Sequence, residues 1–235
     1  MRKHVLTATF CFLVTAAGAQ RNANSIDADN PGQDNPSRVV VQDLQLRGTV
    51  PVMFATLVRE AGLSGGVAIS NRDCSHGPEG SISVPAGTSF YRALGQVAKS
   101  KAMSEGQLRG GVANLLPAYG VPPLLQVRLP RFEWDRTTPV REVIDRLRQL
   151  PEVSEEALKL GLKEAPLEGS GISAVCLGHD CGEKPKPVPI LETEEDATLL
   201  TVLNRIVRAH SGAIWSYTEY HCDKHTLFSL EALAE

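Results

Sequence analysis

The sequence predicts an α+β protein made of two small modules, each with two helices packed on a short-stranded sheet in a βαββαβ-like order. Three observations predict this class. Apolar stripes with helical spacing alternate with short β-branched segments, this alternation occurs twice, and glycine or proline separates the elements. The composition, 42% hydrophobic and 22% charged, is that of an ordinary globular protein. We expect the modules to span residues 38–120 and 121–235.

The first 19 residues have the layout of a secretory signal peptide. Arg2 and Lys3 precede an apolar run, and Ala17-Gly18-Ala19 is a small-residue cleavage site. We expect cleavage after Ala19, which makes the mature protein periplasmic or secreted, with no membrane span after cleavage; an uncleaved anchor is the alternative. Residues 20–37 carry almost no apolar side chains, and this composition predicts a disordered linker.

The elements of the first module follow from apolar spacing and turn residues. Phe54, Leu57, Val58 and Ala61 recur on one helical face, and Gly62 ends that helix. In order, we expect a strand at 38–48, a helix opened by Pro51, strands at 67–70 and 81–84, a helix capped by Thr88 or Ser89, and a hairpin ending at 112–117.

Pro122-Pro123, which breaks any helix, marks the boundary with the second module. It carries an insertion at about 151–187. In order, we expect a strand at 124–134, a helix capped by Thr137 or Thr138 before Pro139, a short helix at 153–160, a strand at 188–193, a helix from Thr198, and strands at 212–220 and 225–233. Because TVPVMFATLVREAG in the first module matches TTPVREVIDRLRQL in the second, we interpret the two modules as an internal duplication.

Two stretches of the first module, TVPVMFATLVREAGLSGGVAIS and GSISVPAGTSFYRALGQVAKSKAM, resemble the short N-terminal domain of secretins and TonB-dependent receptors. The resemblance is clearest over residues 50–103, and the second module shares it in outline. The shared pattern is apolar spacing and contains no catalytic residue. It implies a small periplasmic α+β module that acts by protein–protein contact, with an outer-membrane transport or secretion component as the kind of partner. No secretin pore region follows the modules in these 235 residues, so we expect a free-standing adaptor.

Cysteine and histidine gather in two segments of the second module, CLGHDC (176–181) and HCDKH (221–225). Thiolates and imidazoles are zinc ligands, so one hypothesis is a metal site. Its candidate ligands are Cys176, His179, Cys181, His221, Cys222 and His225.

Disulfide bonds are the interpretation that an exported protein favours, because an oxidising compartment converts thiols into disulfides. Cys11 leaves with the signal peptide, so four candidates remain, an even number: Cys74, Cys176, Cys181 and Cys222. Cys74 is the one cysteine of the first module, so pairing of all four requires a bond between the modules. Cys176–Cys181 with Cys74–Cys222 is one arrangement, and Cys222 paired within its own module is another. The sequence does not choose between them.

The sequence contains little that indicates nucleic-acid binding or catalysis. The net charge is −3, and basic residues do not form a stripe with aromatics, so we expect no nucleic-acid partner. The sequence lacks G-x-S-x-G, H-E-x-x-H and a phosphate-binding G-x-x-x-x-G-K motif, so we do not expect an enzyme. Trp215 and Tyr217 fall on one face of a predicted strand, where they either pack in the core or form a contact patch for a partner.

These observations predict an exported, non-enzymatic cell-envelope protein that needs no cofactor. It would act through protein–protein contacts, as a periplasmic adaptor or scaffold for another envelope protein. The alternative is an exported metal-binding protein or hydrolytic enzyme that uses the Cys/His cluster.

Overall fold

The computed structural model describes residue 40, residues 42–166 with gaps at 75–76, 78 and 100–105, and residues 189–234. The predicted signal peptide, the predicted linker and the CLGHDC segment lie outside the described residues. None of the helices in the described ranges is long and apolar enough to cross a membrane.

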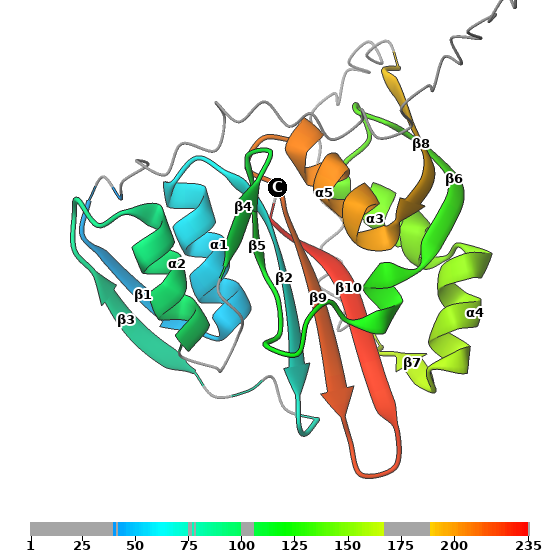
Figure 1. Ribbon diagram of the computed structural model, residues 1–235, viewed down its shortest axis with the longest axis horizontal. Coiled ribbons are helices and arrows are strands. Elements are labelled where there is room, and N and C mark those ends of the chain that lie inside the picture. The colour runs from blue at the N-terminus through cyan, green and yellow to red at the C-terminus, as the bar shows by residue number, and fades with distance from the viewer. Residues whose placement is uncertain are drawn as a thin grey trace, which may run out of the picture.

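The described residues form helices and strands in mixed sheets, which confirms the predicted α+β class (Figure 1). The first half contains β1 (Leu44–Gly48), α1 (Val50–Glu60), β2 (Ser64–Asn71), β3 (Gly80–Val84), α2 (Phe90–Lys99), β4 (Gln107–Arg109) and β5 (Val112–Leu115). The second half contains a 3-10 turn η1 (Pro123–Gln126), β6 (Arg128–Asp135), α3 (Val140–Arg148), α4 (Pro151–Lys159), β7 (Leu162–Glu164), β8 (Leu191–Thr198), α5 (Leu199–Ala209), β9 (Ile214–His221) and β10 (Thr226–Ala234).

Local chemistry accounts for most helix starts. The Thr198 hydroxyl accepts a hydrogen bond from the Thr201 amide (3.2 Å), and Ser89 accepts one from the Arg92 amide (3.4 Å), so α5 and α2 begin where side-chain caps were expected. The predicted threonine cap of α3 is wrong. Thr137 donates instead to the Asp135 carboxylate through both its amide (2.9 Å) and its hydroxyl (2.7 Å), and α3 starts after Pro139 without a side-chain cap.

A second difference from the predictions lies at the start of the second half. Leu124 and Leu125 were expected to open a strand, but they form η1 directly after Pro122. Both side chains are completely buried. The tight turn brings two consecutive leucines into the same core, which a strand could not do because its successive side chains point to opposite faces.

The two halves repeat one pattern of strand pairing. In the first half β1 pairs with β3, and β2 runs parallel to β5, which is antiparallel to β4. In the second half β6 pairs with β8, and β7 runs parallel to β10, which is antiparallel to β9. β2 therefore corresponds to β7 and β4 to β9, as the predicted internal duplication requires.

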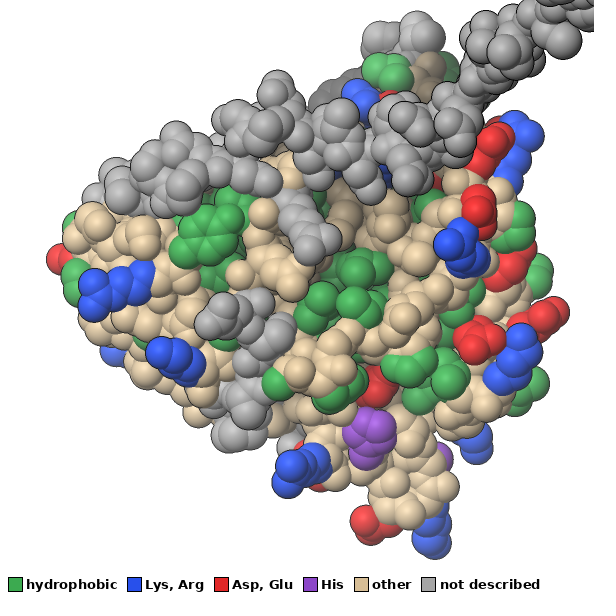
Figure 2. Space-filling model, viewed as in Figure 1, with side chains coloured by type: hydrophobic (Ala, Val, Ile, Leu, Met, Phe, Trp, Pro, Cys, Tyr) green, Lys and Arg blue, Asp and Glu red, His purple; other side chains and the backbone are tan. Residues whose placement is uncertain are grey.

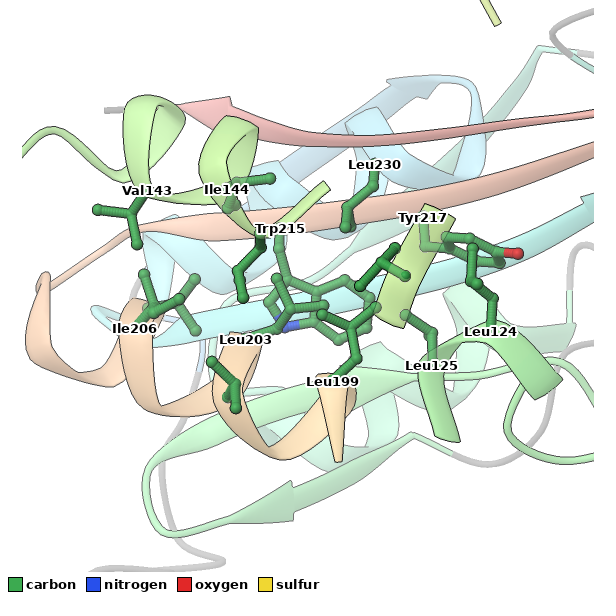
Figure 3. Close-up of a cluster of buried hydrophobic side chains, with 14 of the residues drawn as sticks. Leu124, Leu125, Val143, Ile144, Leu199, Leu203, Ile206, Trp215, Tyr217 and Leu230 are labelled. Carbon is green, nitrogen blue, oxygen red and sulfur yellow. The ribbon is translucent and has the colours of Figure 1, made fainter. Parts of the chain in front are cut away.

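One sheet joins the halves, because β2 also pairs with β9 and produces the order β4-β5-β2-β9-β10-β7. Alternate residues of β2 belong to different cores. Val67 and Ile69 pack with α1 and α2, whereas Ala68 packs with α3 and α5. Side chains of a strand alternate between the faces of a sheet, so the helices of the two halves cover opposite faces. Figure 3 shows the core of the second half.

Candidate functional site: the junction of the two halves

The junction is the parallel pairing of β2 with β9, in register from Gly65 with Ile214 to Asn71 with Tyr220. Seven of the eight residues of β2 are buried. The carboxyl ends of parallel strands meet at the same edge of a sheet, so the residues that follow Asn71 and His221 come together. The cysteine and histidine residues lie at that end of the junction.

Trp215 packs across the junction near its start. It stands opposite Gly66 in the register, and any Cβ atom at position 66 would overlap its indole ring. The indole Nε1 donates to Asn204 Oδ1 on α5 (3.0 Å), so the same side chain ties a helix of the second half to a strand of the first. Only glycine at position 66 leaves room for this contact.

Trp215 and Tyr217 are both fully buried, in the core that Figure 3 draws. Of the two alternatives for this pair, the burial supports packing in the core and contradicts a contact patch for a partner. The period-two pattern of the strand identified their shared face, but that face lies under α3 and α5. A partner would reach these rings only by opening the core.

A polar group lies between Trp215 and the end of β9. The Tyr217 hydroxyl donates to Glu219 Oε1 (2.6 Å), and His221 Nε2 lies 2.9 Å from Ser70 Oγ and 3.5 Å from Glu219 Oε2. Burial, with the Glu219 charge and the hydrogen bond to it as further causes, raises the pKa of Tyr217 well above its ordinary value.

This polar group does not have the geometry of a nucleophile relay. In such a relay the serine and the acid contact different nitrogens of the imidazole. Here Ser70 and Glu219 meet the same nitrogen of His221, and Thr226 Oγ1 lies 3.4 Å from the other one. The group ties β2 to β9 with polar contacts near the strand ends.

Cys74 and Cys222 form a disulfide at the end of the junction, with their Cα atoms 5.2 Å apart. This distance is ordinary for a disulfide. The bond joins the two halves across 148 residues of sequence. It is one of the two pairings of Cys222 that the sequence allowed, the one between the modules. Cys176, His179 and Cys181 lie outside the described residues.

His225 completes a cluster with the two cysteines. The Cys222 amide donates to the His225 carbonyl (3.0 Å) in the turn between β9 and β10, which brings the imidazole back towards the sulfur atoms. The ligand atoms of Cys74, Cys222 and His225 all lie within 4.8 Å of one another. Figure 2 shows histidine side chains at this lower end of the molecule, near the charged tip of the hairpin.

The sequence-based list of metal candidates contained Cys222 and His225 but missed Cys74. Proximity of Cys74 depends on the pairing of β2 with β9, which no local pattern reveals. The list also contained His221, whose ring nitrogens lie beside Ser70 and Thr226. Among the described residues, His221 does not belong to the three-residue cluster.

A cavity of about 560 Å³ lies at the opposite end of the junction, between the start of α3 and the end of α5, with Arg59 of α1 on its wall. Two of its polar side chains, His210 and Arg136, already have protein partners. His210 lies within hydrogen-bond distance of the Ile206 carbonyl (2.9 Å) and the Thr138 carbonyl (3.1 Å), and Arg136 pairs with Glu192 (2.6 Å). The cavity therefore offers less distinctive chemistry than the Cys/His end.

Comparisons with family models, with curated proteins and with solved structures find no match for this chain. The resemblance to the short N-terminal domain of secretins and TonB-dependent receptors thus rests on the residues quoted for it.

Proposed function

We propose that this chain is an exported, non-enzymatic cell-envelope protein that acts through protein–protein contacts as a periplasmic adaptor or scaffold. The predicted signal peptide supports export, and so does the Cys74–Cys222 disulfide, because disulfides persist mainly in oxidising compartments. The resemblance in the first module supports a contact role and implies an outer-membrane transport or secretion component as the partner.

The observation that carries the proposal is the open edge of β7. β7 corresponds to β2, and the outer edge of β2 is the one that pairs with β9. Among the described residues no strand pairs with the outer edge of β7. One copy of this edge thus joins the halves, and within the described ranges, which omit residues 167–188, the other copy is available to an incoming strand.

Contacts with β10 and α3 fix the position of β7 in the sheet. The Ala165 amide donates to the Phe228 carbonyl of β10 (2.8 Å). Glu164 pairs with Arg148 of α3 (2.7 Å), whose side chain is only 7% exposed. Because neighbouring amides of a strand point to opposite sides, the inward amide of Ala165 leaves that of Glu164 directed outwards. The exposed, charged side chains of Lys163 and Glu164 keep this edge from unselective pairing.

The test compares Glu164→Pro with Glu164→Ala in tagged protein cross-linked in the cell envelope of its own host. Both substitutions remove the ion pair with Arg148, but only proline removes the outward amide. We expect the cross-linked partner to be retained by Glu164→Ala and lost by Glu164→Pro, with both variants folded by circular dichroism. Equal capture by the two variants would contradict strand addition at β7.

Export is tested separately by the intact mass of the purified chain. The proposal predicts a mature protein that begins at Gln20. A chain that retains its first 19 residues after production in a secreting host would contradict the predicted cleavage.

A further inference from the structure

We propose that Cys74, Cys222 and His225 form a binding site for a thiophilic divalent cation, of which Zn²⁺ is the type, whenever the disulfide between the two cysteines is reduced. This inference does not depend on the proposed adaptor role. It means that the two halves are linked by the disulfide when the cysteines are oxidised and by a bound cation when they are reduced.

The geometry supplies three ligands of the right kind at the right separation. In a tetrahedral zinc site, with bonds of about 2.3 Å to sulfur and about 2.0 Å to nitrogen, neighbouring ligand atoms lie roughly 3.5 to 4 Å apart. The three ligand atoms here lie within 4.8 Å of one another. The two sulfur atoms are bonded in the oxidised state, so reduction must let them separate to this spacing by side-chain rotation, and water would take the fourth position.

The backbone holds these ligands together in both redox states. β2 and β9 end side by side, so Cys74 and Cys222 are placed by a buried pairing that runs from Gly65 to Asn71. The hydrogen bond from the Cys222 amide to the His225 carbonyl fixes the turn that carries the imidazole. Loss of the S–S bond therefore leaves a largely preformed site.

Solvent reaches this site. Cys74 and His225 are exposed and Cys222 is half-buried. An external thiolate and a hydrated cation can both approach. The cavity at the other end of the junction lacks thiolates, and its histidine is engaged by two carbonyls.

The redox step needs a dithiol as reductant. One thiolate of the dithiol attacks a sulfur of the disulfide, which forms a mixed disulfide and releases the other cysteine as a thiolate. The second thiol of the reagent then displaces the first cysteine and becomes part of a cyclic disulfide. Two electrons and two protons pass to Cys74 and Cys222. Binding of the cation takes up both cysteines as thiolates and releases those two protons to solvent.

The consequence is that the halves stay linked in either state. The disulfide joins Cys74 to Cys222 directly when oxidised, and the cation bridges the same two sulfur atoms when reduced. A site with this behaviour loses metal on oxidation and regains it on reduction.

The test uses full-length C11S/C176S/C181S protein, in which Cys74 and Cys222 are the remaining cysteines of the chain. Reduced with dithiothreitol, freed of reductant and titrated with Co²⁺, it should bind one equivalent. The complex should show the visible absorption of tetrahedral cobalt and a thiolate-to-cobalt charge-transfer band, both removed by Zn²⁺. The oxidised protein should give neither signal.

Two histidine variants in the same background locate the third ligand. His225→Ala should weaken cobalt binding at least about tenfold, since even residues behind the ligands change affinity by this much. His221→Ala is the matched control, one position before Cys222, and should bind as tightly as its parent. Failure of the reduced protein to bind Co²⁺, binding by the oxidised protein, or equal effects of the two histidine variants would each overturn the proposal.

Discussion

The outer edges of β2 and β7 hold the same place in the two halves, yet among the residues that the structure describes the β2 edge is paired and the β7 edge is not. β2 has eight residues, nearly all buried, and Gly66 near its start leaves room for the indole of Trp215. β7 has three residues, of which Lys163 and Glu164 are exposed. The comparison teaches that strand position alone does not decide whether an edge is occupied. Length, burial and a glycine facing a large ring make the β2 edge a permanent junction.

Removal of the Trp215 indole, which packs against β2, should cause the largest loss in the free energy of unfolding. Trp215→Ala deletes a fully buried indole from the shared sheet, and truncation of a buried aromatic costs about 3 to 5 kcal/mol. Urea unfolding followed by circular dichroism measures this loss. A loss below about 1 kcal/mol would mean that the junction does not depend on Trp215, and the contrast with β7 would fail.

Removal of the Cys74–Cys222 disulfide should cause the next largest loss in stability. Loss of a native disulfide typically costs about 2 to 5 kcal/mol, because the unfolded chain gains freedom, and the Cys74–Cys222 bond spans 148 residues. In a C176S/C181S background, Cys74→Ser should lower the unfolding midpoint under oxidising conditions and make it insensitive to dithiothreitol. If dithiothreitol still lowered the midpoint of Cys74→Ser as much as that of the parent, the stabilising bond would lie elsewhere.

A single methyl group added at position 66 of β2 should have a smaller but diagnostic effect on stability. Gly66→Ala places a Cβ inside the volume of the indole, and overpacking of a core costs about 1 to 3 kcal/mol. Gly95→Ala is the matched control, because its Cβ meets nothing within 4 Å and alanine favours a helix interior by up to about 1 kcal/mol. Thermal melts should therefore shift in opposite directions. A shift of the same sign would contradict the close approach of β2 and Trp215.

The smallest effect concerns alkaline pH. Burial raises the pKa of Tyr217 above the unfolded value of about 10. The stability that neutral Tyr217 contributes is thus fully present below about pH 10 and is lost as the pH rises towards the folded pKa. Spectrophotometric titration of folded protein should show a late phenolate that is absent in Tyr217→Phe. Complete ionisation of all tyrosines near pH 10, with the fold intact, would contradict the burial of this hydroxyl.

The sequence predicted what local periodicity controls. The apolar stripes of α1, α2, α3 and α5 and the alternation along β9 predicted these elements and the class of fold. The sequence did not predict β7 (Leu162–Glu164), because the stretch 151–187 is interpreted as an insertion. It did not predict that β2 would pair with β9, since those strands are far apart in the chain and nothing local specifies their neighbours. For the same reason, the sequence could not identify the disulfide partner of Cys74. It also could not decide whether Trp215 packs in the core or contacts a partner.

Elements with competing local chemistry were also missed. Thr137 had the right residue type for a cap, but the neighbouring Asp135 carboxylate binds its amide and hydroxyl first. Leu124 and Leu125 fit an apolar strand equally well, and only the shape of the core requires both to face the same side. The residue types alone do not show which of two possible hydrogen bonds or backbone conformations forms.

Hydrogen exchange at single amides tests most directly whether one edge is closed and its counterpart open. The Gly65 amide on β2 donates to the Ala213 carbonyl just before β9 (3.1 Å), and the Ala165 amide donates inwards from the end of β7 to Phe228 (2.8 Å). In oxidised protein without a partner, nuclear magnetic resonance should find both of these amides protected and the outward amide of Glu164 exchanging rapidly. Protection of Glu164 equal to that of Gly65 would contradict the account, because it would mean that the edge of β7 is already occupied.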